Sequence, residues 1–93
     1  MSDTEDKFLI YAEDVQKIKA LILQSRYQSA YKANVELLNL YYNVGRYISL
    51  NTRSGKWGTN AINSISQQLQ GELEKLHGFS PSNMKNMRTF FES

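Results

Sequence analysis

The sequence predicts an all-α protein, in which one long N-terminal helix packs on a helix-turn-helix-like hairpin of two shorter helices. Apolar residues recur at helical spacing in two long stretches, and alternation with a period of two is almost absent. The single proline, Pro81, lies close to the end of the chain. With 93 residues, the chain suffices for one domain, although a domain of this size buries only about 60% of the surface of its unfolded chain. We therefore expect thin stability, which a partner chain can raise.

The first apolar stripe predicts one long helix from about Glu13 to Leu50. Glu13 and Asp14 favour its start, because carboxylates stabilise the positive end of a helix dipole. The stripe weakens across residues 25–32, where small and polar side chains dominate, yet neither glycine nor proline interrupts the chain there. We expect a bend at this point, with two separate helices as the alternative.

A loop is predicted over Asn51–Gly58, which combines two glycines with small polar residues. Thr59 follows as a candidate N-cap, whose hydroxyl can accept an amide proton of the first helical turn. The next apolar stripe predicts a second helix over about residues 60–76. Gly78 can supply the left-handed backbone that commonly ends a helix.

A third helix is predicted from Ser80-Pro81 onward, because serine is a good N-cap and proline fits the first helical position. Met84, Met87 and Phe91 share one face of this helix and form its candidate core contact. The helical pattern is still present at Ser93, so we expect the natural chain to continue beyond this residue.

Charge is unevenly distributed along the chain. Residues 1–14 carry five acidic side chains and one lysine, whereas the remainder carries ten basic and four acidic side chains, or about +6. Residues 1–12 are expected to form an acidic, disordered tail, and residues 13–93 the helical domain. The polar N-terminus does not resemble a secretory signal, and the longest apolar run, residues 20–23, cannot cross a bilayer. We expect a cytoplasmic protein without membrane contact.

No catalytic residue, metal ligand or cofactor site is predicted. The Gly55–Gly58 segment lacks the spacing of a phosphate-binding loop. His77 is the only histidine and cysteine is absent, so the common zinc ligand sets cannot form. Asp3, Glu5 and Lys7 have the spacing of a PD-(D/E)XK motif only trivially, because no strand is predicted to support them.

Polar side chains on the outward face of the third helix suggest DNA binding. A helix, a short turn and a second helix can place that second helix in the major groove. The candidate nucleic-acid-binding residues are Ser82, Asn83, Lys85, Asn86 and Arg88, with Arg53 and Lys56 in the preceding loop. Against this, residues 61–93 balance three basic with three acidic side chains, which is a weak footprint for phosphate binding. The alternative is an ordinary solvated face.

The chain is also rich in aromatic residues for so small a core, which suggests an interface with a second copy or another domain. The candidate interface residues are Tyr31, Tyr41, Tyr42, Tyr47 and Trp57. The alternative is a core built largely from rings.

Three strings of residues occur together in a fixed order along the chain. They are Asn34 with Leu40-Tyr41-Tyr42-Asn43-Val44-Gly45 and Ile48; Trp57-Gly58 followed by Ile62, Ser66 and Leu69; and Gly78-Phe79-Ser80 with Asn83-Met84 and Met87-Arg88-Thr89-Phe90-Phe91. Over about residues 15–92 the sequence resembles the N-terminal helical domain of YhcG-type PD-(D/E)XK nucleases. It departs at Tyr42, often tryptophan in that family, and at Phe91, often tyrosine.

The resemblance implies a bacterial protein in which this helical domain precedes a C-terminal nuclease domain that is absent from the chain. Two hypotheses follow. In the first, the domain is a non-catalytic accessory module that binds DNA through its third helix and the Asn51–Gly58 loop. In the second, it is a protein-interaction module that forms a homo-oligomer and does not contact DNA. Gly45 has a structural role under either, because a glycine here permits close approach of another helix.

Overall fold

The structure is a computed structural model that describes residues 3–25, 35–73 and 76–93 of the chain. It contains four helices in these ranges and no strand: α1 (Asp3–Gln24), α2 (Val35–Arg53), α3 (Ala61–Glu72) and α4 (Pro81–Glu92). The all-α prediction is confirmed.

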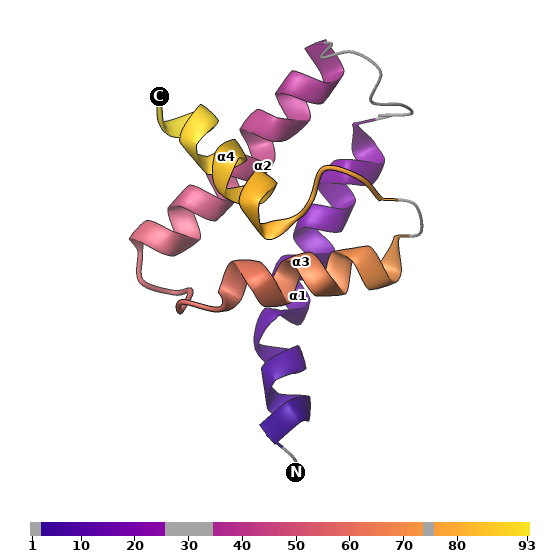
Figure 1. The fold of residues 1–93 in the computed structure, drawn as a ribbon, viewed down its shortest axis with the longest axis vertical. Helices are drawn as coiled ribbons and strands as arrows, with labels where there is room; N and C mark the ends of the chain where they lie inside the picture. The colour runs from indigo at the N-terminus through magenta and orange to yellow at the C-terminus, as the bar shows by residue number, and fades with distance from the viewer. Residues whose placement is uncertain (1–2, 26–34, 74–75) are drawn as a thin grey trace.

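The helices form two crossed pairs around one core (Figure 1). α4 lies across α2 in the most extensive helix-to-helix contact, and α3 lies across α1. Contacts between α1 and α2, and between α3 and α4, join the two pairs. The core draws on every helix and on the two connections that flank α3. Its buried members are Val15, Ile18, Ile22, Leu40, Val44, Ile48, Trp57, Ala61, Ile65, Leu69, Phe79, Met84 and Met87.

The single long helix predicted from Glu13 to Leu50 is wrong, and the two-helix alternative is confirmed. Leu21 of α1 and Asn43 of α2 line the same pocket, whereas in a continuous helix they would lie about 33 Å apart at ~1.5 Å per residue. At the end of α1, the Ser25 hydroxyl donates to the Ile22 carbonyl over 2.7 Å. Such a bond lets a serine compete with the helical backbone. Residues 26–34, which include Tyr31, lie outside the described residues.

α1 begins at Asp3 rather than at Glu13, so it takes in most of the segment for which a disordered tail is predicted. The physical reason is that the acidic residues of this segment lie in the first turn, where the helix dipole favours negative charge. Neither proline nor glycine interrupts the chain before Gln24. A charge pattern that suggests a solvated tail is therefore also a helix start signal.

α2 continues to Arg53 and so includes the first residues of the predicted loop. The side chains of Asn51 and Thr52 donate to the carbonyls of Tyr47 and Ile48, over 2.8 and 2.7 Å, and these bonds fit within a helix. The chain turns only at Gly55, which has a left-handed φ of 79°.

α3 is shorter than the predicted helix over residues 60–76. Its N-cap is Asn60, whose side chain makes no capping bond, so the prediction of Thr59 as N-cap is wrong. The Ala61 amide instead donates to the Gly58 carbonyl over 3.3 Å, which places Thr59 inside a tight turn. At the other end the chain leaves the helix at Leu73, where the backbone is extended.

The predicted start of α4 is confirmed. Ser80 is the N-cap, its hydroxyl accepts from the Asn83 amide over 3.2 Å, and Pro81 occupies the first turn. Gly78 has a left-handed φ of 86°, as expected, although it lies within the connection rather than directly after α3. The buried Ser66 hydroxyl donates to the Phe79 carbonyl over 2.7 Å. This bond ties the connection to α3 and so fixes where α4 begins.

Candidate nucleic-acid interface

α4 is anchored on α2 by its backbone as well as by its side chains. Met84 and Met87 are fully buried beneath it. At the crossing point, a methyl group on Gly45 would overlap the Met87 carbonyl oxygen and lie 2.6 Å from the carbonyl carbon. The prediction that Gly45 permits close approach of another helix is confirmed. Because the two backbones touch, α4 cannot slide along α2 without opening the core.

The outward face of α4 carries most of the predicted nucleic-acid-binding residues. Ser82, Asn83, Lys85 and Asn86 are all exposed along it. Hydroxyl and amide groups can donate to and accept from base edges or phosphates, and the lysine adds a cation. The structure therefore brings these four side chains together on the exposed side of one helix.

Arg88 has an internal partner. Its Nε donates to Glu92 Oε2 over 2.8 Å, and the same oxygen accepts from the Ser49 hydroxyl over 2.5 Å. The Ser49 bond and then the Arg88 bond lower the pKa of the Glu92 carboxyl, and the charge of Arg53 adds to this shift. Arg53, at the end of α2, thus lies near the C-terminal turn of α4. Lys56 is exposed in the connection between α2 and α3.

A pocket of about 290 Å³ opens beside the outward face, between α2 and α4. Its lining residues are Leu38 and Tyr41 of α2 with Asn83, Asn86, Met87 and Phe90 of α4. The sequence predicted that the two asparagines lie on the outward face of the helix, but it did not predict the pocket that they line. The available signal was the spacing of positions 83, 86, 87 and 90, which share one flank of a helix.

The aromatic residues divide between core and surface. Trp57 is buried and its ring packs edge-on against Tyr47 at a centroid distance of 5.9 Å. The Tyr47 hydroxyl donates to the buried carboxylate of Asp14 over 2.5 Å, and the Tyr41 ring packs edge-on against Phe79. Trp57 is therefore part of the core and Tyr47 packs against it partly buried, while a role of either ring in an interface stays a prediction. Tyr42, which is 47% exposed, remains on the surface.

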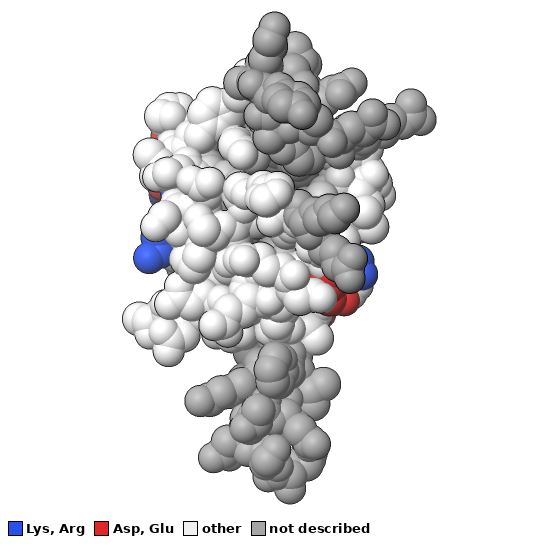
Figure 2. All heavy atoms as spheres, turned by 45° about the vertical axis from the view of Figure 1, so that its right-hand side comes forward, with Lys and Arg blue, Asp and Glu red and all other residues white. Residues whose placement is uncertain are grey.

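Charged groups are sparse on the face shown in Figure 2, where most of the described surface is neutral. The described part of the chain contains no group of three or more histidine, aspartate or glutamate side chains that could hold a metal ion. Within the same residues, no helix has the length and apolar character that crossing a membrane requires.

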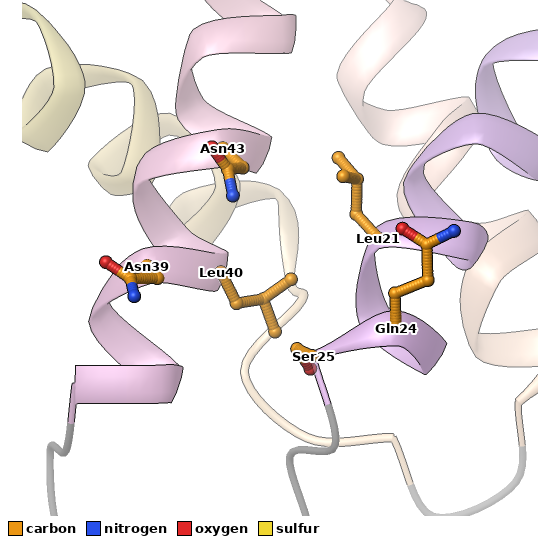
Figure 3. Close-up of a pocket in the computed structure, with 6 residues that line it drawn as sticks. All are labelled: Leu21, Gln24, Ser25, Asn39, Leu40 and Asn43. Atoms are coloured by element: carbon orange, nitrogen blue, oxygen red, sulfur yellow. The ribbon is translucent and has the colours of Figure 1, made fainter.

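A second pocket of about 290 Å³ lies between α1 and α2 (Figure 3). Leu40 extends from α2 towards α1, with Leu21 on the opposite wall. Gln24, Ser25, Asn39 and Asn43 complete the lining. None of the lining side chains that the structure describes is titratable, and the polar ones among them offer hydrogen bonds.

The α3–α4 pair differs from a strict helix-turn-helix. The connection Leu73–Ser80 is longer than the ~3–4-residue turn of that motif, and α4 rests mainly on α2 rather than on α3. The described residues form a small helical domain in which α4 is packed closely on α2 and exposes a polar face. The chain belongs to the DUF1016 N-terminal domain family, whose sequence profile matches residues 17–93. No curated protein and no solved structure matches the chain.

Proposed function

We propose that this chain is the non-catalytic accessory domain of a cytoplasmic YhcG-type PD-(D/E)XK nuclease, and that it contacts DNA through the outward face of α4. The first part rests on the resemblance of the strings around Gly45, Ser80 and Arg88 to that nuclease family. The second part rests on one observation: Ser82, Asn83, Lys85 and Asn86 are exposed together on a helix whose backbone is fixed against Gly45. A rigid, hydrogen-bonding helix face is what readout of base edges requires.

The charges predict weak binding by this domain alone. Lys85, Arg53 and Lys56 make none of the ion pairs found among the described side chains, whereas Arg88 is paired with Glu92. Three phosphate contacts give a salt slope of about −3, since each released counterion contributes ~0.9. Such a domain would keep a nuclease domain on the same chain close to DNA. When two weak binding sites are on one chain, binding of the first raises the effective concentration for the second, so the overall affinity exceeds that of either site.

The test is binding of the chain to a labelled duplex across a salt series. We expect a slope near −3, and we expect Lys85→Ala with Arg88→Ala to weaken binding about tenfold and to reduce the slope by about one, because Arg88 is already paired with Glu92. The matched control is Lys17→Ala with Arg46→Ala, which removes two cations next to Tyr47 in α1 and α2. Equal loss in both double variants, or no binding at low salt, contradicts the proposal.

A second candidate function, assembly through α2 and α4, is favoured by an exposed apolar cluster. Leu38, Tyr42 and Phe90 are 42%, 47% and 45% exposed, and the rings of Tyr42 and Phe90 are in edge-on contact at 6.5 Å. Grouped exposed apolar side chains commonly mark protein interfaces. Sedimentation equilibrium tests this function: a dimer that Tyr42→Ser dissociates supports it, and a monomer at high concentration excludes it.

A further inference from the structure

The pocket between α2 and α4 combines three kinds of group that nucleobase recognition uses. Phe90 offers an exposed ring, Asn83 and Asn86 offer side-chain amides, and Leu38 with Met87 provides an apolar wall. Single-stranded nucleic acids are commonly bound by stacking of bases on aromatic side chains and by hydrogen bonds to base edges. An asparagine amide carries both donors and an acceptor, so it can pair with either kind of edge atom.

The Phe90 ring is held in place from below. Tyr42 contacts Phe90 edge-on at 6.5 Å and Phe91 at 5.0 Å. Both phenylalanines therefore rest on one tyrosine of α2, and α2 is locked to α4 at Gly45 and Met87. A ring that is already fixed loses little conformational freedom when a base stacks on it, which favours binding.

The size of the recess suits one base. A volume of about 290 Å³ lies at the lower end of the ~300–1,000 Å³ range of small-molecule pockets. It suits a single planar ring system rather than several stacked nucleotides. Lys85, which precedes Asn86 in α4, is exposed, and its long side chain supplies a cation for a phosphate of the bound strand.

We propose that this pocket binds one unpaired nucleobase, so that α4 recognises single-stranded or flipped-out positions in DNA. The inference rests on the proposed function and names its substrate class. Bases inside a regular duplex are stacked on both sides and cannot enter a recess on the flank of a helix. The pocket therefore selects strands with an unpaired base, and Lys85 adds affinity for any strand.

The test compares binding of the chain to three labelled probes: a single strand, the matching duplex and the same duplex with one bulged base. We expect the single strand and the bulged duplex to bind more tightly than the perfect duplex. Phe90→Ala is expected to weaken binding of the single strand and of the bulged duplex about tenfold. Binding of the perfect duplex should stay unchanged. Asn83→Ala with Asn86→Ala should reduce discrimination between different bulged bases.

Two controls separate recognition from folding. Phe90→Tyr keeps the ring and should keep the preference for unpaired bases, and Phe90→Ala should melt within a few degrees of the wild type, because the side chain is 45% exposed. Lys85→Ala should weaken binding of all three probes by a similar factor.

The outcomes distinguish the inference from the function on which it rests. Duplex binding without preference for unpaired bases, unchanged by Phe90→Ala, overturns the pocket but leaves the DNA contact of α4. Absence of binding to every probe overturns both. If the chain binds no probe but forms a dimer, and Phe90→Ala dissociates that dimer, the pocket belongs to a protein interface. This outcome also overturns the inference.

Discussion

Gly45 of α2 and Met87 of α4 meet backbone to backbone, with no room for a methyl group between the glycine and the Met87 carbonyl. This contact determines how close the two helices lie. It holds the exposed face of α4, and the pocket beside it, at a fixed position on the molecule.

Gly45→Ala is expected to destabilise the domain by about 2 kcal/mol. Overpacking costs ~1–3 kcal/mol, and a backbone carbonyl cannot move aside as the end of a flexible side chain can. The melting temperature should fall by about 10 °C, at ~4–8 °C per kcal/mol for a domain of this size.

Gly71→Ala is the matched control for that substitution. Gly71 lies in α3, and none of the residues that the structure describes is within 4 Å of the position that its added methyl would take. Alanine there should stabilise the helix by up to about 1 kcal/mol, because glycine is the poorer helix former. Thermal melting of both variants provides the measurement. A similar fall in melting temperature for the two would contradict the close crossing of α2 and α4.

Ser80→Ala is expected to cost about 1 kcal/mol of unfolding free energy. The Ser80 hydroxyl accepts from the Asn83 amide, and loss of a serine N-cap typically has this effect. Ser82→Ala serves as the control, because Ser82 is an exposed serine inside the helix and alanine has the higher helix propensity. Urea denaturation should give a lower midpoint for the first variant and an equal or higher midpoint for the second.

Local signals predicted the part of the fold that positions the site. Ser80 and Pro81 are adjacent in sequence and act within one helical turn, so the start of α4 could be read directly. The burial of Met84 and Met87 followed from their helical spacing. The role of Gly45 could be predicted because glycine is a poor helix former, so a glycine within an apolar helix face suggests close approach of another backbone.

Features that depend on contacts between distant parts of the chain could not be predicted from the sequence in this way. The separation of α1 and α2 has no glycine or proline marker, and the two helices are joined across the core by the bond between Asp14 and Tyr47. Thr59 failed as an N-cap because the Gly58 carbonyl met the first amide of α3. The pocket needs Leu38 and Tyr41 as well as α4, and no pattern within one helix reveals its second wall.

Tyr47→Phe is expected to cost about 2 kcal/mol at neutral pH. The buried Asp14 carboxylate, which is 2% exposed, loses the hydroxyl that donates to it, and hydrogen bonds to charged groups contribute ~1.5–3 kcal/mol. Tyr42→Phe removes a hydroxyl from an exposed ring and should have little effect. Urea denaturation of the two variants distinguishes a structural bond from a general effect of tyrosine loss.

The same bond predicts a loss of stability in alkali. Burial, and then the Asp14 hydrogen bond, raise the pKa of Tyr47 above its ordinary value of 10.0. The unfolded chain therefore ionises first, and the contribution of Tyr47 is present below pH 10 and is lost as the pH rises towards the folded-state pKa. Stability measured between about pH 9 and about pH 11 should fall more steeply in the wild type than in Tyr47→Phe. Parallel curves for the two proteins would contradict this assignment.

Glu92→Gln is expected to strengthen DNA binding. The carboxylate holds Arg88 by a 2.8 Å bond, and glutamine keeps an oxygen that can accept from Ser49 while it removes the negative charge beside Arg88 and Arg53. With Arg88 released, one more cation can contact phosphate, so affinity at low salt should rise about threefold to tenfold and the salt slope should steepen by about one. Glu72→Gln is the matched control, because it removes the ion pair with Lys19 at the contact between α1 and α3, away from α4. A duplex titration across a salt series should show the gain for Glu92→Gln alone. An equal gain in both variants would indicate a general effect of net charge, and no gain in either would place Arg88 outside the DNA contact.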